Sequence, residues 1–225
     1  RLVTASAGSF GAGLSYAGNE LGKDVVVHAP EATPERKVEL MRKFGAEVVL
    51  VGANYPEAYR AARQYGEHHG IPYASPFDNK AVVAGAVSLG QEIIRQMPDK
   101  APRTIYVPVG GGGLLAGMLA AAAGHERVSV VGVQYEGHDS LERSLEAGEC
   151  ADASGELDTT CEGSAVKRIG AIPFAVASYY RDFLDGVVTV SPAEVGEALW
   201  QESLLRHELV PVYRYETAFD GMPET

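Results

Sequence analysis

Four consecutive glycines stand where an apolar, strand-like run gives way to a helical pattern. The run is Gly110, Gly111, Gly112 and Gly113, preceded by Val107-Pro108-Val109 and followed by Leu114. Because these residues lack side chains, their N–H groups can converge on an anion, and the positive end of the next helix favours negative charge. The spacing is neither that of a P-loop nor that of a dinucleotide fingerprint. The loop therefore predicts a phosphate site, with a merely flexible turn as the alternative.

A second run of small residues follows the apolar segment at the beginning of the chain. It consists of Ser6, Ala7, Gly8, Ser9 and Phe10. The serine hydroxyls and the N–H groups at the start of the next helix can together hold a carboxylate. The alternative is an ordinary capped turn between a strand and a helix.

A third segment is polar, is bounded by glycines and lacks helical or strand periodicity. It reads Glu162-Gly163-Ser164-Ala165-Val166-Lys167-Arg168-Ile169-Gly170. Taken alone, this segment indicates only a surface loop.

The elements that must position these loops alternate along the chain. Short apolar runs rich in β-branched residues predict strands at 2–5, 24–29, 47–51, 104–109, 129–134 and 187–190. Longer stretches predict helices at 12–21, 33–44, 55–69, 82–96, 114–123, 140–147, 173–183 and 193–206, with Thr33 as the N-cap of the second. This order predicts an α/β fold with mostly parallel sheets covered by helices on both faces.

The composition excludes several functional classes. The chain has 225 residues, 46% of them hydrophobic, and a formal net charge of -11. That charge repels phosphate backbones, so we expect no nucleic-acid partner. No apolar run is long enough to cross a bilayer and no signal peptide is visible, so we expect no membrane partner. The two cysteines, Cys150 and Cys161, form no CxxC pair, which disfavours zinc and fits a cytoplasmic location.

Taken in order, the motifs resemble those of the threonine dehydratases (threonine ammonia-lyases) and serine dehydratases. These are fold-type-II pyridoxal-phosphate-dependent enzymes of the tryptophan synthase β-like superfamily. Residues 3–8 are similar to the family's substrate-carboxylate loop, residues 110–114 match its phosphate-binding glycine loop, and residues 162–170 match its EG-AVKR-G segment. Three further segments fit in the same order: Gly52-Ala53-Asn54, Pro76-Phe77-Asp78 and residues 187–191.

The resemblance implies both an architecture and a chemistry. It implies two three-layer α/β/α domains with the cofactor between them: a small substrate-carboxylate-loop domain over 1–80 and a large cofactor-phosphate domain over 81–225. Pyridoxal phosphate would join the substrate amine and withdraw electrons while the α-proton and the β-hydroxyl leave. The substrate carboxylate would lie on residues 6–10. The cofactor would contact Gly110, Gly111, Gly112, Gly113, Leu114, Ser9, Glu162, Gly163 and Arg214.

The catalytic base is the main departure from the family. There, the lysine that holds the cofactor is also the base, and it precedes the carboxylate loop in a Phe-Lys-x-Arg-Gly segment. No lysine of this chain matches that motif; they are Lys23, Lys37, Lys43, Lys80, Lys100 and Lys167. We therefore expect the catalytic lysine to lie outside this sequence, which is then truncated at its N-terminus.

Other positions depart as well. Ser9-Phe10 replaces the family's Asn-His, and residues 85–88 replace its Gly-Gln-Gly-Thr. Arg214 falls where a serine faces the pyridine nitrogen, and a guanidinium cannot accept a proton there, which weakens the electron sink. Ala7 stands where serine racemases have a second serine, which disfavours racemisation relative to elimination.

The resemblance also implies two kinds of partner. Some members bind a divalent cation beside the EG segment, and here Glu156, the carbonyl of Thr160 and Glu162 have chemistry suited to Mg²⁺ or Ca²⁺; two merely solvated glutamates are the alternative. Strand edges bared by a missing segment favour self-association, so we expect a homo-oligomer.

Three functions follow from these patterns. The first is a pyridoxal-phosphate-dependent lyase that converts threonine or a serine-like amino acid into a 2-oxo acid and ammonia. The second is a degenerate, non-catalytic homologue that lacks the Schiff-base lysine and binds cofactor, amino acid or a partner subunit. The third is a protein that keeps only the glycine loop and binds a phosphate ligand other than pyridoxal phosphate, which the EG-AVKR-G match disfavours.

Overall fold

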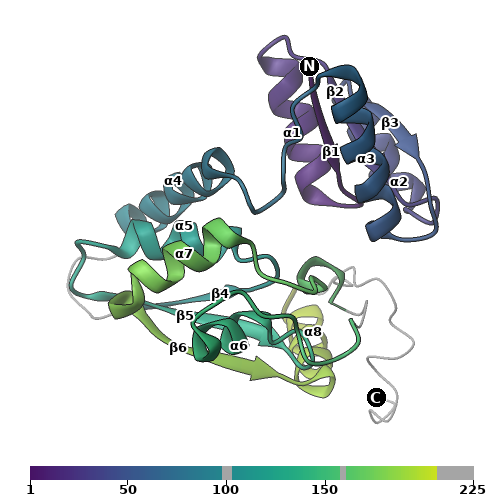
Figure 1. Ribbon diagram of the computed structural model, residues 1–225. Coiled ribbons are helices and arrows are strands. Elements are labelled where there is room, and N and C mark those ends of the chain that lie inside the picture. Colours follow the sequence, from purple (N-terminus) through teal and green to yellow (C-terminus); the bar gives the residue numbers. More distant parts are fainter. Residues whose placement is uncertain (98–102, 158–160, 207–225) are drawn as a thin grey trace. The chain divides into compact units, whose positions relative to one another are not determined.

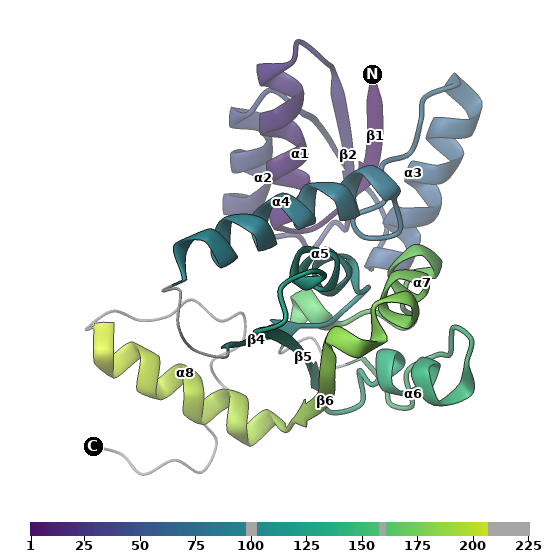
Figure 2. The same ribbon diagram turned by 90° about the vertical axis from the view of Figure 1, so that its left-hand side faces the viewer.

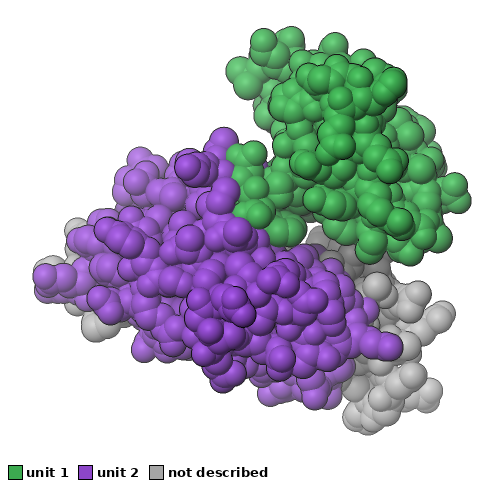
Figure 3. Space-filling view, in the orientation of Figure 1, with its two compact units in different colours: residues 1–79 green, residues 80–225 purple. Residues whose placement is uncertain are grey.

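The computed structural model describes residues 1–97, 103–157 and 161–206. The chain divides into two units, residues 1–79 and residues 80–225, which Figure 3 shows in different colours. Each unit is built on its own sheet of three parallel strands. No helix in the described ranges is both long and apolar enough to span a membrane.

The sheet of the first unit consists of β1 (Leu2–Ala5), β2 (Val25–Ala29) and β3 (Glu47–Leu50), in that order (Figure 1). Helices α1 (Ser9–Glu20) and α2 (Glu35–Lys43) lie on one face, where Val25, Val27 and Met41 are buried. Helix α3 (Tyr55–His69) covers the other face, over Val3 and Val26. Strand β2 is buried at every residue because it is central in the sheet and covered on both faces.

The helix caps of this unit follow the sequence signals only in part. Asn54 caps α3 by accepting a hydrogen bond from the N–H of Glu57 at 3.1 Å. The expected cap at Thr33 is wrong. Helix α2 is capped by Pro34, and the buried Thr33 hydroxyl has no partner within the described ranges. The helical hydrogen bonds begin one residue later than expected, because the Pro34 carbonyl accepts from the N–H groups of Lys37 and Val38.

The sheet of the second unit has the order β4 (Arg103–Pro108), β5 (Val128–Tyr135) and β6 (Leu184–Val190). Figures 1 and 2 show helices α5 (Gly113–Ala122), α6 (Ser140–Ala147) and α7 (Ala171–Tyr179) around it. The core of this unit includes Val107, Val130, Leu119, Leu141 and Ile169. Two short 3₁₀ helices, η1 (Glu162–Ser164) and η2 (Arg181–Phe183), flank α7, and α8 (Pro192–Arg206) follows β6.

The face of this sheet that points away from the core is partly uncovered. Tyr106 is 66% exposed and Val188 is 43% exposed. They pair with Val131 and Val133 of β5, which are two residues apart and therefore point to the same face of the sheet. Parallel strands are usually covered on both faces. Among the described residues, the helical layer on this side is therefore incomplete.

An irregularity separates the two halves of β6. Val130 pairs with Leu184 whereas Gly132 pairs with Val187, so β6 has one residue more than β5 over this stretch. Gly186 absorbs the extra residue with φ +126°, a conformation that side chains rarely allow.

Helix α4 (Lys80–Gln96) crosses α5 at close range through glycines. A Cβ added at Gly90 would lie 2.6 Å from the Cβ of Ala121, and one added at Gly117 would lie 2.4 Å from the Cβ of Ala86. This crossing fixes α5, whose first turn follows the four-glycine loop.

The expected α/β fold with parallel sheets is confirmed. Strand β1 and helices α3 and α6 have the expected bounds. The single helix expected over 173–183 is instead α7 followed by η2. The break after Tyr179 lets the chain turn into β6.

Replacing Gly90 with alanine should lower the free energy of unfolding by about 1–2 kcal/mol, because the new methyl group must displace Ala121. Urea denaturation measures the change. Gly85→Ala is the matched control, since a Cβ at Gly85 in the same helix meets nothing within 4 Å. It should be neutral or stabilising by up to about 1 kcal/mol. Equal effects of the two substitutions would contradict a tight crossing.

Candidate functional site

The four-glycine loop connects β4 to α5 and presents unsatisfied donors. Gly112 is the N-cap of α5 with φ +85°, and no side chain caps the helix. Gly111, Gly112 and Gly113 are buried. Within the described part of the chain, the N–H groups of residues 110–114 have no hydrogen-bond acceptor. They lie at the positive end of a helix, which is the arrangement that binds anions.

The loop packs directly against the segment 163–170. A Cβ added at Gly110 would lie 3.0 Å from the carbonyl oxygen of Gly163 and 3.1 Å from the Cα of Ser164. The N–H of Gly170 donates to the carbonyl of Gly111 at 3.1 Å. A Cβ at Gly112 would meet the side chain of Ile169 at 2.9 Å. The structure thus brings two of the three sequence motifs together.

Lys167 anchors this segment to a neighbouring loop. Its Nζ donates to the carbonyls of Ala153, at 2.7 Å, and Gly155, at 3.1 Å. The backbone carbonyl of Lys167 also accepts from the N–H of Ala153 at 2.7 Å. These contacts give the lysine of the AVKR motif a structural role that needs no cofactor.

Asp139 holds the other side of the same loop. Its carboxylate accepts a hydrogen bond from the N–H of Ser154 at 2.7 Å. Burial raises the pKa of Asp139, but the hydrogen bonds from Ser154 and from its own backbone, together with the charge of Arg143, hold the pKa below its ordinary value. The Asp139 carboxylate is therefore ionised at neutral pH when it accepts these hydrogen bonds.

The expected carboxylate loop connects β1 to α1 in the first unit. The buried Ser6 hydroxyl accepts from the N–H groups of Gly8, at 3.2 Å, and Gly11, at 3.0 Å. Ser6 therefore shapes the loop through its own backbone. Ser9 is exposed, Ala7 and Phe10 are half-buried, and the N–H groups of these three residues have no acceptor within the described ranges. The donors available to an anion are thus mainly backbone groups.

His28 lies on β2, next to this loop. Its carbonyl accepts from the N–H of Ser6 at 3.0 Å, and its ring packs 5.2 Å from that of Tyr65 on α3. The side chain is 3% exposed and its Nδ1 has no partner in the described part of the structure. Burial lowers the pKa of His28, although the negative charge of Glu47 acts in the opposite direction.

Three expected site residues cannot be placed. Thr160 and Arg214 lie outside the described residues, and only the backbone of Glu162 is described. Glu156 is exposed. Considering only the described ranges, no group of three His, Cys, Asp or Glu side chains is arranged to hold a metal ion.

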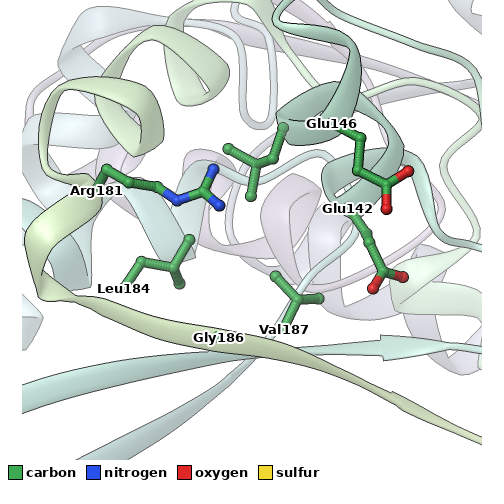
Figure 4. A pocket seen from close by; sticks show the side chains of 7 residues that line it. Glu142, Glu146, Arg181, Leu184, Gly186 and Val187 are labelled. Carbon is green, nitrogen blue, oxygen red and sulfur yellow. The ribbon is translucent and has the colours of Figure 1, made fainter.

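An open pocket of about 210 Å³ lies elsewhere in the second unit, between α6, η2 and β6. Figure 4 shows Arg181 pointing into it from the side opposite Glu142 and Glu146. Leu145, Leu184, Gly186 and Val187 complete its lining. None of the expected site residues lines this pocket, so it is separate from the glycine loop.

Sequence reasoning did not single out the residues that support the segment behind the glycine loop. The Nδ1 of His138 lies 3.2 Å from the Oγ of Ser164, and His138 is 1% exposed. A signal was present, because His138 follows the buried run of β5, and loops at the carboxyl ends of parallel strands form ligand sites. A single histidine in such a loop is too common a feature to identify from sequence.

Residues 1–210 match the protein family described as pyridoxal-phosphate dependent enzyme. The chain belongs to this family.

Proteins named threonine ammonia-lyase, threonine deaminase and serine racemase are similar to this chain. An L-threonine ammonia-lyase of Geobacter sulfurreducens is 39% identical over 199 residues, which are 88% of this chain and 48% of that protein. The processed form of threonine deaminase isoform 2 from Solanum lycopersicum has 31% identity and a TM-score of 0.85, over 93% of this chain and 60% of that one. A serine racemase from Dictyostelium discoideum has 28% identity and a TM-score of 0.76, over 92% and 64%. The chain thus spans less than two thirds of each.

The glycine loop fits the phosphate group of the family's cofactor. Its unpartnered N–H groups suit phosphate oxygens, and side chains at Gly110 or Gly112 would collide with the segment behind the loop. The fit is shown at this end of the cofactor. Arg214, expected at the pyridine nitrogen, lies outside the described residues, and the side chain of Glu162 is not described.

Gly110→Ala should weaken pyridoxal phosphate binding about tenfold or more, because the added methyl group forces the loop away from Gly163 and Ser164. Equilibrium dialysis with pyridoxal phosphate measures the affinity. Gly13→Ala is the control, since Gly13 is exposed on α1 and a Cβ there meets nothing within 4 Å. Unchanged affinity of the Gly110 variant would argue against a phosphate site at this loop.

The chain should also lose stability as the pH falls below the ordinary histidine pKa of 6.5. Since the pKa of His28 is lower in the folded chain, the unfolded chain binds more protons in this range, and the free energy of unfolding decreases. Urea denaturation at neutral pH and at about pH 5.5 reveals the effect. His28→Phe should reduce this pH dependence, whereas His125→Gln, at an exposed position, should preserve it. The same pH dependence in both variants would exclude His28 as the cause.

Proposed function

We propose that this chain is part of a pyridoxal-phosphate-dependent ammonia-lyase that converts threonine or serine into a 2-oxo acid and ammonia. The observation that carries the proposal is the glycine loop, whose free N–H groups at the start of α5 are packed on residues 163–170. The 39% identity to the L-threonine ammonia-lyase of Geobacter sulfurreducens supports the reaction type.

The residues of this chain would bind and orient. The N–H groups of residues 110–114 would hold the cofactor phosphate, and Gly163 with Ser164 would keep that loop in place. The N–H groups of Ala7, Ser9 and Phe10 would hold the substrate carboxylate at the start of α1. When bound, pyridoxal phosphate supplies an electron sink for removal of the α-proton. In this proposal residues 1–80 form the substrate domain and residues 81–225 the cofactor domain.

Two features decide between neighbouring activities. Ala7 has no hydroxyl that could return a proton to the substrate, which favours elimination over the racemisation named for the Dictyostelium discoideum relative. Lys167, the lysine of the AVKR motif, is bound to the carbonyls of Ala153 and Gly155 and would not act as the base. A non-catalytic homologue that keeps cofactor or amino-acid binding is the second candidate, because Ser9 and Arg214 depart from the family pattern.

Three further expectations belong to this proposal. A Mg²⁺ or Ca²⁺ ion beside Glu156 stays a prediction. So does self-association, which the exposed Tyr106 and Val188 on the second sheet support, because an apolar sheet face is usually covered. A cytoplasmic location likewise stays a prediction.

The deciding experiment combines covalent trapping with an activity assay. The protein as produced by its native gene is incubated with pyridoxal phosphate, reduced with borohydride and analysed by intact mass and peptide mapping. Formation of 2-oxo acid from L-threonine and from L-serine is assayed in parallel. We expect one cofactor per chain, bound to a lysine outside the present 225 residues, together with 2-oxo acid production.

The other outcomes are equally informative. Cofactor affinity without an adduct and without product would favour the non-catalytic homologue. An adduct on one of the six lysines of this chain would contradict the assignment of the base. Complete absence of cofactor binding would overturn the proposal.

A further inference from the structure

A chain of buried polar contacts connects helix α6 to the segment behind the glycine loop. The Oε1 of Gln134, at the end of β5, accepts from the N–H of Glu142 in α6 at 3.1 Å. The amide nitrogen of Gln134 donates to the carbonyl of His138 at 2.5 Å. Gln134 is fully buried and His138 is 1% exposed. Gln134 thus fixes the backbone that carries the imidazole.

The hydrogen bond between the imidazole of His138 and Ser164 has a donor and an acceptor that the neighbouring contacts indicate. The Oγ of Ser164 donates to the carbonyl of Cys161 at 3.0 Å, and the same Oγ lies 3.2 Å from the Nδ1 of His138. A hydroxyl has one proton, so with that proton directed at the Cys161 carbonyl the imidazole supplies the proton of the bond between His138 and Ser164. His138 therefore donates through Nδ1, and Ser164 accepts.

Ser164 in turn sets the position of the glycine loop. Its Cα lies 3.1 Å from where a Cβ of Gly110 would stand, next to the carbonyl of Gly163 at 3.0 Å. Because this contact is backbone against backbone, a shift of the turn at residues 161–164 moves the surface on which the loop rests. The loop has no side chains with which to compensate.

We infer that His138 is a positioning residue for the glycine loop, acting through the Nδ1–H bond to the hydroxyl of Ser164. The bond joins the loop after β5 to the turn at residues 161–164, and so holds that turn against Gly110. The inference deepens the proposed function, on which the role of the loop as a phosphate site rests. The geometric part, that His138 orders the loop, stands without a cofactor.

The test replaces His138 by two amides of different reach. In His138→Asn the amide nitrogen can take the place of Nδ1 and keep a donor for Ser164. In His138→Gln the amide reaches the place of Nε2 instead, so the bond to Ser164 is lost although a polar side chain remains. His138→Leu removes both nitrogens, and Ser164→Ala removes the acceptor.

Each substitution is made in the protein as encoded by its native gene, and two quantities are measured for each variant. The dissociation constant for pyridoxal phosphate should rise about two- to tenfold in the Gln, Leu and Ala variants and stay near the wild-type value in His138→Asn. Hydrogen exchange of the amides of Ala116 and Gly170, which donate to the carbonyls of Gly112 and Gly111, should accelerate in the same three variants. Amides of β1 should be unaffected, which separates a local effect from global destabilisation. Combining His138→Leu with Ser164→Ala should add little to either alone.

The outcomes separate the two claims. Wild-type affinity and exchange in His138→Gln would overturn the role of His138, as would equal weakening in His138→Asn and His138→Leu. If the wild-type protein binds no pyridoxal phosphate, the proposed function fails, and the exchange of the Ala116 and Gly170 amides still decides whether His138 orders the loop.

Discussion

The second unit depends on a contact between two stretches of backbone. Residues 110–112 lie so close to residues 163–170 that a Cβ at Gly110 would lie 3.0 Å from the carbonyl oxygen of Gly163, and one at Gly112 would lie 2.9 Å from the side chain of Ile169. Close packing of this kind tolerates little change in volume. The start of α5, the turn at residues 161–164 and the loop held by Lys167 therefore form one connected arrangement. This arrangement carries a row of N–H groups without acceptors in the described part of the chain.

Parallel topology explains why these segments meet. The carboxyl ends of β4 and β5 lie at the same edge of the sheet, because Pro108 pairs with Val133 and the strands run in one direction. The glycine loop leaves β4 there, and the loop with His138 leaves β5 there. The corresponding edge of the first sheet carries the turn from β1 into α1. Each unit thus places N–H groups without acceptors in the described part of the chain where helix N-termini and strand ends coincide.

Much of this could be predicted from sequence, for identifiable reasons. Alternating apolar runs and helical patterns located the strands and helices, since burial imposes those periods directly. The glycine loop was visible because four adjacent glycines have few other uses. Caps and contacts were less predictable. The Thr33 hydroxyl does not cap α2, and Ser6 turns its hydroxyl to its own loop, because backbone geometry decides which acceptor an N–H reaches. The contact of His138 with Ser164 joins residues far apart in the chain, so no local pattern contains it.

Lys167 gives the loop at 153–155 an unusual kind of stability. An ammonium group donates there to two backbone carbonyls that would otherwise need another donor. Here the cation is covalently tethered, so its local concentration is set by the length of its own side chain. The loop at 153–155 and the segment that packs on the glycines are thereby joined by a cation that belongs to the chain itself.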